Sequence, residues 1–438
     1  MSRKLRLLGP LLLLMAAAPG AVAQEVQVAA LPEPDLFSAA ARETGLGPDL
    51  WKGASPEALR DVIRLAQEAR PSPAARALAL RLLGSGAAAP GAAGRDAALA
   101  AGRLRALLAL GDLAGAETAA SRTPGLERSS ALSAAAAELA LLSDDTPRAC
   151  QIAERLSEGR GEAYWLRLRA FCRLEAQDPG QAQLTFDLAQ SQAPDPVFGR
   201  LMGARLRGAG GGPASLRNGL DLALSRRLGL DLAVAKPAPQ VAVALAGAPA
   251  SMAPVWRFTP ETDPVSAALA QLAAGDLEAA SQARSALVQD QIPGADALDL
   301  AILDAALGVA RGRPDGPTLD RLVERAGVGE TGERNRARAA AALVAAAGAP
   351  VSGEVYSAVL AAPGLEAKAP DARLYAMDLA ADANAQGQAA ALALLTALEA
   401  GETGPALGDR VQIVRTLRRV GLQADAAAFA LEGLVGLR

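Results

Sequence analysis

Alanine is the feature that most restricts how this chain can fold. It makes up about a quarter of the 438 residues, whereas aromatic residues make up only 3%. Alanine has the highest helix propensity, and the β-branched and aromatic residues that favour strands are sparse. With 51% apolar and 21% charged residues, the chain has enough apolar surface to bury a core. We therefore predict an all-α protein.

Most of the chain after residue 35 has the pattern of short helices. Leu59, Val62, Ile63 and Ala66 follow the i, i+3, i+4, i+7 spacing of one helical face. Five predicted helices start with a small capping residue followed by Pro, which fits the first helical turn because its missing N–H would have no helical partner there. These starts are Ser55-Pro56, Ser72-Pro73, Thr146-Pro147, Asp178-Pro179 and Asp263-Pro264.

A regular repeat organises part of the chain. Short turns rich in Gly, Asp and Ser lead to Ala116, Ala149 and Ala182, which are equally spaced, and a further turn leads to Ala280 about three periods later. Each turn separates two helices rich in Ala and Leu. A period of this length built from two helices predicts helical-hairpin repeats forming an α-solenoid. The alternative is a generic Ala-rich helical bundle, whose turns would also use Gly and Asp.

The pattern resembles the tetratricopeptide repeat family, in which a Gly-Asp-aromatic turn joins two helices and Pro ends the unit. The most similar unit ends at Pro194 and has the expected residues on both helices: Trp165, Leu166 and Ala170, then Ala182, Phe186 and Ala189. Leu113 and Leu277 replace the aromatic residue of the turn. The resemblance extends over roughly 95–200 and, more weakly, 265–292. It implies a groove that binds a protein or a peptide.

Gly- and Pro-rich segments divide the chain. We predict five parts: a signal peptide (1–23), an N-terminal cap and helical hairpin with a flexible linker (24–94), a first helical array (95–207), a Gly/Pro-rich connector (208–263) and a second helical array (264–438). The linker is the sequence GSGAAAPGAAG, residues 84–94. The irregular central connector contains one plausible extended segment, Val241–Leu245.

The N-terminus has the parts of a secretory signal peptide. Arg3, Lys4 and Arg6 precede a short apolar run, and the sequence AVA predicts cleavage after Ala23. The alternative is an uncleaved membrane anchor, for which the apolar run is short, and no later stretch reaches the ~18 apolar residues of a membrane helix. Arg greatly outnumbers Lys, which is typical of GC-rich bacteria. We predict a periplasmic or secreted protein without membrane insertion after cleavage.

Two cysteines are consistent with an oxidising compartment. Gly161 lies inside a predicted turn between two helices, and Cys150 and Cys172 lie at equal distances from it in the sequence. Residues equidistant from such a turn lie level with each other in an antiparallel helix pair, so the geometry favours a disulfide. The alternative is two buried free thiols.

Several kinds of chemistry are excluded or disfavoured. The chain has no His, which excludes Ser-His-Asp and Cys-His catalysis and a His-ligated zinc. Gly327–Gly332 matches the G-x-G-x-x-G pattern of dinucleotide-binding loops, but the residues before it are helical in pattern, so we interpret it as a turn between helices. Removal of three basic residues with the signal leaves 41 basic against 47 acidic residues, a net charge of −6, which disfavours nucleic acid. We predict no catalytic residue, metal or cofactor.

The few aromatic residues are the candidates for partner binding. Trp256, Arg257 and Phe258 lie in the connector, and Tyr164 and Trp165 begin a predicted helix beside the cysteines. Exposed aromatic residues and Arg dominate interface energetics, whereas buried ones fill the core.

We expect a periplasmic interaction scaffold or adaptor that holds a protein or peptide of the cell envelope. The alternatives are a cell-wall glycan hydrolase on a helical scaffold, which would need paired carboxylates, and a structural spacer of an envelope assembly.

Overall fold

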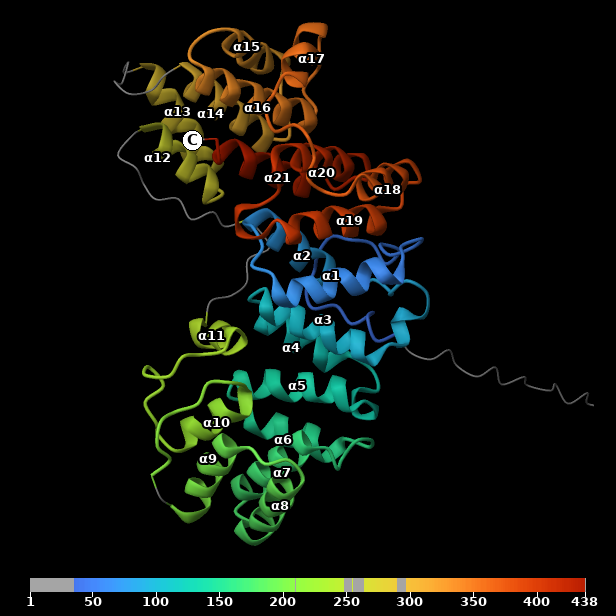
Figure 1. Ribbon diagram of the computed structural model, residues 1–438, viewed down its shortest axis with the longest axis vertical. Helices are drawn as coiled ribbons and strands as arrows, with labels where there is room; N and C mark the ends of the chain where they lie inside the picture. The colour runs from blue at the N-terminus through green and yellow to red at the C-terminus, as the bar shows by residue number, and fades with distance from the viewer. Residues whose placement is uncertain (1–34, 209, 248–253, 255–263, 290–296, 438) are drawn as a thin grey trace, which may run out of the picture. The chain divides into compact units, whose positions relative to one another are not determined.

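The protein is helical, as predicted. A computed structural model describes residues 35–208, 210–247, 254, 264–289 and 297–437. Helical hairpins make up these residues (Figure 1), which confirms the all-α fold class. Among them, no helix combines the length and apolar character needed to cross a membrane. The predicted signal peptide and its cleavage site lie outside the described residues.

The helices are short throughout. The N-terminal half contains α1 (Pro56–Glu68), α2 (Pro73–Gly84), α3 (Ala97–Ala109), α4 (Leu113–Arg122), α5 (Ser130–Leu142), α6 (Thr146–Arg155), α7 (Ala163–Glu175), α8 (Pro179–Gln192), α9 (Pro196–Arg207), α10 (Gly219–Arg227) and α11 (Pro239–Ala246). The C-terminal half contains α12 (Pro264–Ala273), α13 (Leu277–Gln289), α14 (Ala297–Ala310), α15 (Gly316–Gly327), α16 (Thr331–Ala347), α17 (Gly353–Leu360), α18 (Asp371–Asp382), α19 (Gln386–Glu399), α20 (Leu407–Arg419) and α21 (Gln423–Val435).

The predicted turns recur with one geometry. Gly111, Asp144 and Gln177, which follow one another at the period of the repeat, all have positive φ. The residue after each is an Asp that caps the next helix; Asp112, for example, accepts a hydrogen bond from the Gly115 N–H at 2.9 Å. The backbone N–H of each Asp bonds the carbonyl five residues earlier at 2.8–2.9 Å, which closes the preceding helix. The small residues that follow, Ala116, Ala149, Ala182 and Ala280, are fully buried.

Two sequence expectations in this region need correction. Val241–Leu245, predicted to be extended, forms most of α11, because Pro239 starts a helix and the alternating alanines have high helix propensity. The cap of α6 is Asp145 rather than Thr146. By contrast, Gly327–Gly332 lies where α15 ends and α16 begins, as predicted; residues 328–330 form the turn between them, with Gly329 at φ +87°.

The residues predicted as a flexible linker, 84–94, are packed against the N-terminal segment. The Leu36 N–H donates to the Gly94 carbonyl at 2.8 Å, and Ala93 is fully buried. The buried side chain of Arg103, on α3, bonds to both of these segments. Its guanidinium donates to four backbone carbonyls at 2.7–2.9 Å, those of Phe37, Ala39, Leu83 and Ser85. Burial lowers the pKa of Arg103 to about 10, so the group is still charged at neutral pH.

The helices are arranged in an order that differs from their order in the chain. On one side α1 packs against α3, and α3 packs against α5, as consecutive hairpins do. On the other side α1 packs against α19, α2 packs against α21, and α20 packs against α16. The last two hairpins therefore lie between the first hairpin and α14–α16, where Figure 1 shows the red helices beside the blue ones.

Buried polar groups join the first hairpin to the last. The Ala74 N–H, at the start of α2, donates to the Glu432 carboxylate at 2.8 Å, and Glu432 also pairs with Arg410 at 2.7 Å. Arg81 of α2 forms an ion pair with Asp425 of α21. One hydrophobic cluster contains buried residues from both ends of the chain. Because unpaired buried charges are costly, these bonds favour a single arrangement of the junction.

A substitution at Gly387 tests this junction. A Cβ at this position of α19 would lie 2.3 Å from the Leu50 carbonyl oxygen and 2.9 Å from the Trp51 ring. We expect Gly387→Ala to lower the free energy of unfolding by about 1–3 kcal/mol in urea denaturation. Gly180→Ala on α8 is the control, because its Cβ would meet only Asp178 at 3.9 Å. Equal stability of both variants would contradict a tightly packed junction.

The predicted disulfide is confirmed. Cys150 of α6 and Cys172 of α7 are bonded, and the described residues contain no free cysteine. The bond closes a loop with a sequence separation of 22.

Reduction of this bond should lower the free energy of unfolding by about 3 kcal/mol, because the open chain gains conformational entropy when it unfolds. Urea denaturation with and without dithiothreitol measures the effect. The Cys150→Ser/Cys172→Ser variant should be destabilised to the same degree and should not respond to the reductant. A response of that variant would assign the effect to something other than the disulfide.

Candidate functional site

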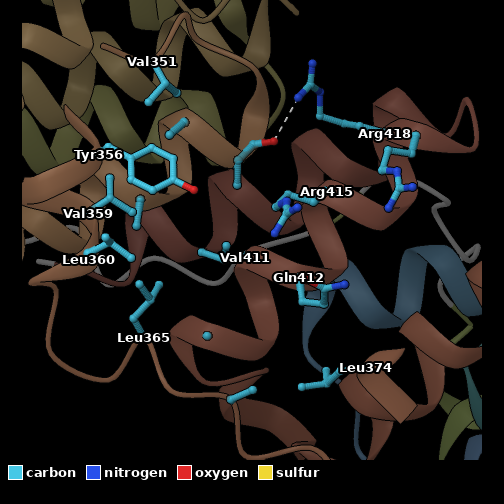
Figure 2. A pocket seen from close by; sticks show the side chains of 16 residues that line it. Val351, Tyr356, Val359, Leu360, Leu365, Leu374, Val411, Gln412, Arg415 and Arg418 are labelled. Atoms are coloured by element: carbon cyan, nitrogen blue, oxygen red, sulfur yellow. Dashed lines mark hydrogen bonds between the residues drawn. The ribbon is translucent and has the colours of Figure 1, made fainter. Parts of the chain in front are cut away.

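A groove of about 670 Å³ lies among α16, α17, α18 and α20. Its lining consists mainly of apolar side chains on one side and of arginines on the other (Figure 2). We call it the arginine-rimmed groove. The residues used below are Val351, Tyr356, Leu360, Arg415, Arg418 and Arg419.

The spacing of α20 explains how one helix serves both the core and the groove. Val411, Gln412 and Arg415 follow the i, i+1, i+4 spacing of one helical face and line the groove. On the opposite face, Ile413 and Leu417 are fully buried. The Gly408 backbone lies so close to the loop before α18 that a Cβ there would be 2.2 Å from the Leu365 carbonyl oxygen. The groove floor is therefore set by packing.

The apolar side of the groove is exposed to solvent. Val351 is 47% exposed, Tyr356 63% and Leu360 66%, and Tyr356 and Leu360 lie one turn apart on α17. With Tyr375 and Leu379 of α18, they make up half of the ten large apolar side chains that are exposed in the described residues. Single exposed apolar residues are common on protein surfaces, but here five of them are concentrated within residues 351–379.

The opposite side is positively charged. Arg418 donates to the Ala346 carbonyl at 3.1 Å, and Arg419 pairs with Asp378 at 3.0 Å and with Asp382. Arg415 is exposed and has no hydrogen bond or ion pair among the described residues. The sixteen lining residues include no Asp or Glu. Arg415 and Arg418 therefore carry positive charge that no ion pair among the described residues offsets, whereas Asp378 and Asp382 offset that of Arg419.

The side chains of the groove lining carry few reactive groups. Its lining contains no carboxyl group and no thiol, and Tyr356 supplies its only hydroxyl. Within the described ranges, no group of three or more His, Cys, Asp or Glu side chains is placed to hold a metal ion.

The structure separates the aromatic residues that the sequence singled out. Trp165 is fully buried, and its indole N–H donates to the Ser130 hydroxyl at 2.8 Å, so it is a core residue. Tyr164 packs edge-on against Trp165, with ring centroids 5.0 Å apart, and its hydroxyl lies in a different hollow beside Glu138. The predicted binding residues Trp256, Arg257 and Phe258 lie outside the described residues.

Sequence reasoning did not find the arginine-rimmed groove. Two of the three tyrosines of the chain, Tyr356 and Tyr375, lie in or beside its helices, and tyrosine is enriched at interfaces. That enrichment was the one available signal, but the pattern of α17 alone does not show which apolar residues remain exposed.

Comparisons of the chain with protein families, with curated proteins and with solved structures found no match.

Proposed function

We propose that this protein is a scaffold or adaptor of the bacterial periplasm that holds a segment of an envelope protein in the arginine-rimmed groove. The segment would present large apolar side chains together with an acidic group. The observation that supports this function best is the exposed row of Val351, Tyr356 and Leu360 opposite Arg415, which has no partner among the described residues.

The other features support the setting of the proposal. The disulfide favours an oxidising compartment, and the recurring helix–turn–helix units resemble tetratricopeptide repeats, whose grooves bind proteins and peptides. The first 23 residues have the pattern of a signal peptide.

The alternatives make different demands. A glycan hydrolase needs two carboxyl groups across one cleft, whereas the groove lining supplies none and the hollow beside Tyr164 supplies Glu138. If the protein were a structural spacer, substitutions in the groove would not change its function.

Site-specific photocrosslinking in cells tests the proposal. A benzoylphenylalanine in place of Tyr356 should crosslink to an envelope protein, because the side chain is exposed at the centre of the apolar row. The same probe in place of Leu184 on α8, which is 65% exposed, is the matched control and should give no such product. The same products from both positions, or none from 356, would contradict the adaptor function.

Charge reversal tests the arginine side of the groove. Arg415→Glu should reduce the crosslink from position 356 at least tenfold, because it would repel the acidic group of the partner. Arg155→Glu at the end of α6, also an exposed position, should have no effect. Equal effects of both substitutions would indicate non-specific electrostatics.

A further inference from the structure

The side chains on both sides of the arginine-rimmed groove are spaced by turns of a helix. Tyr356 and Leu360 lie one turn apart on α17, and Val411 and Arg415 lie one turn apart on α20. α17 packs against α15 and α16, and its Val355 is buried, whereas Tyr356 and Leu360 stay exposed on the groove side. One face of α17 is therefore covered by its own chain, and another is open to an occupant of the groove.

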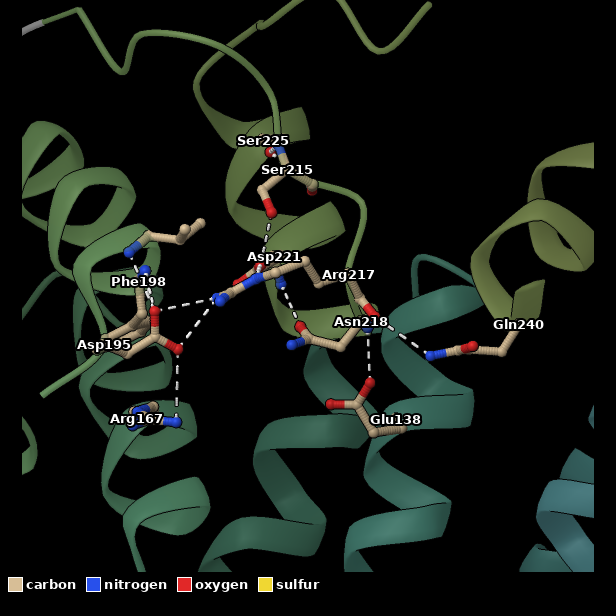
Figure 3. Close-up of polar contacts among 12 residues, drawn as sticks. Glu138, Arg167, Asp195, Phe198, Ser215, Arg217, Asn218, Asp221, Ser225 and Gln240 are labelled. Carbon is tan, nitrogen blue, oxygen red and sulfur yellow. Dashed lines mark hydrogen bonds and ion pairs between the residues drawn. The ribbon is translucent and has the colours of Figure 1, made fainter. Parts of the chain in front are cut away.

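The N-terminal half shows what this protein supplies where a non-helical segment packs among its helices. Residues 211–218 are not helical, and polar side chains of α10 and α11 bond their backbone (Figure 3). The Ser215 N–H donates to the Ser225 hydroxyl at 3.0 Å. The side-chain amide of Gln240 donates to the Arg217 carbonyl at 3.2 Å. An extended segment therefore depends here on side chains that satisfy its backbone groups.

The arginine-rimmed groove has few such side chains. Only two side chains of its lining can accept a hydrogen bond, those of Tyr356 and Gln412. The described residues contain no strand, so they offer no sheet edge to which an extended segment could add. An extended occupant would leave most of the N–H groups that face the groove without a side-chain acceptor, and each of these costs free energy. An α-helix bonds its own backbone groups, so only its side chains must match the groove.

We propose that the arginine-rimmed groove binds an amphipathic α-helix of the envelope protein. This inference rests on the adaptor function proposed above. Apolar residues at i, i+4 and i+7 of the helix pack against Tyr356 and Leu360, because residues with this spacing share one face. An Asp or Glu beside that face pairs with Arg415. Because α17 has 8 residues and is therefore about 12 Å long, two to three turns of the bound helix are in contact.

Two labelled peptides of identical composition test the conformation of the occupant. In the first, leucines follow the i, i+3, i+4, i+7 spacing with a glutamate beside them, so the peptide is amphipathic as a helix. In the second, the same leucines alternate with polar residues, so the peptide is amphipathic only when extended. In fluorescence anisotropy with the purified protein, the helical peptide should bind at least tenfold more tightly than the alternating one.

A proline at the centre of the helical peptide should weaken its binding at least tenfold, because proline breaks a helix. Three results would overturn the proposal. They are equal binding of the helical and alternating peptides, tighter binding of the alternating peptide, and no binding of the helical peptide at millimolar concentration.

Matched variants locate the bound peptide. Tyr356→Ser/Leu360→Ser should weaken binding of the helical peptide at least tenfold, because it removes the exposed apolar pair of α17. Leu184→Ser/Leu188→Ser on α8 is the control and should have no effect. It removes two side chains that are also one turn apart and are 65% and 53% exposed. Equal effects of the two double variants would show non-specific contact with exposed apolar side chains and would overturn the proposal.

A change in the peptide tests the pairing with Arg415. Replacement of the glutamate by glutamine should weaken binding to the unsubstituted protein about tenfold. The same replacement should have little effect on binding to the Arg415→Gln variant, because that variant has lost the cation. An equal loss with both proteins would overturn this pairing.

The crosslink from position 356 separates this inference from the adaptor function. The crosslink tests whether a partner is held at the groove, whereas the peptides test its conformation. A crosslinked partner together with a preference for the alternating peptide would overturn the helical occupant and leave the adaptor function in place. A dimer of the chain that Tyr356→Ser/Leu360→Ser converts to a monomer in sedimentation would assign the groove to a second copy and overturn both.

Discussion

The contact between the first hairpin and the last two is the interaction on which the rest of the structure depends. At its centre, the Glu432 carboxylate accepts from the start of α2 and pairs with Arg410, while both groups are buried. Buried charges in such a position are tolerated only when each is paired, which makes other arrangements of the two ends costly. Because of this contact, the helices that form the arginine-rimmed groove share one hydrophobic cluster with α1 to α5.

Small side chains and arginines contribute to the stability of this core in different ways. Each alanine buries little area, so stability comes from many close helix contacts rather than from a few large residues. The polar connections come largely from arginine: Arg103 joins the segments around α2 and α3, and Arg217 joins α9 to α10. The planar guanidinium suits this role because it donates in several directions and remains charged when buried.

The lining of the arginine-rimmed groove differs in charge from that of the hollow beside Tyr164. The arginine-rimmed groove combines exposed apolar side chains with arginines and has no carboxyl group in its lining. The lining of the hollow beside Tyr164 includes both a carboxyl group, that of Glu138, and a guanidinium, that of Arg105. In the proposed function, the first arrangement suits an acidic, apolar segment of a larger chain.

The sequence by itself determined the helical class, the hairpin period, the capped turns and the disulfide. These features depend on residues close together in the chain. Asp112 caps α4 by accepting from the N–H three residues later, and Cys150 and Cys172 lie level with each other across one turn. Tertiary structure alone decided that α1 packs against α19 and that Tyr356 stays exposed while Val355 beside it is buried. Such outcomes depend on which distant surfaces cover a segment, and the local pattern of an Ala-rich helix offers several nearly equivalent faces to cover.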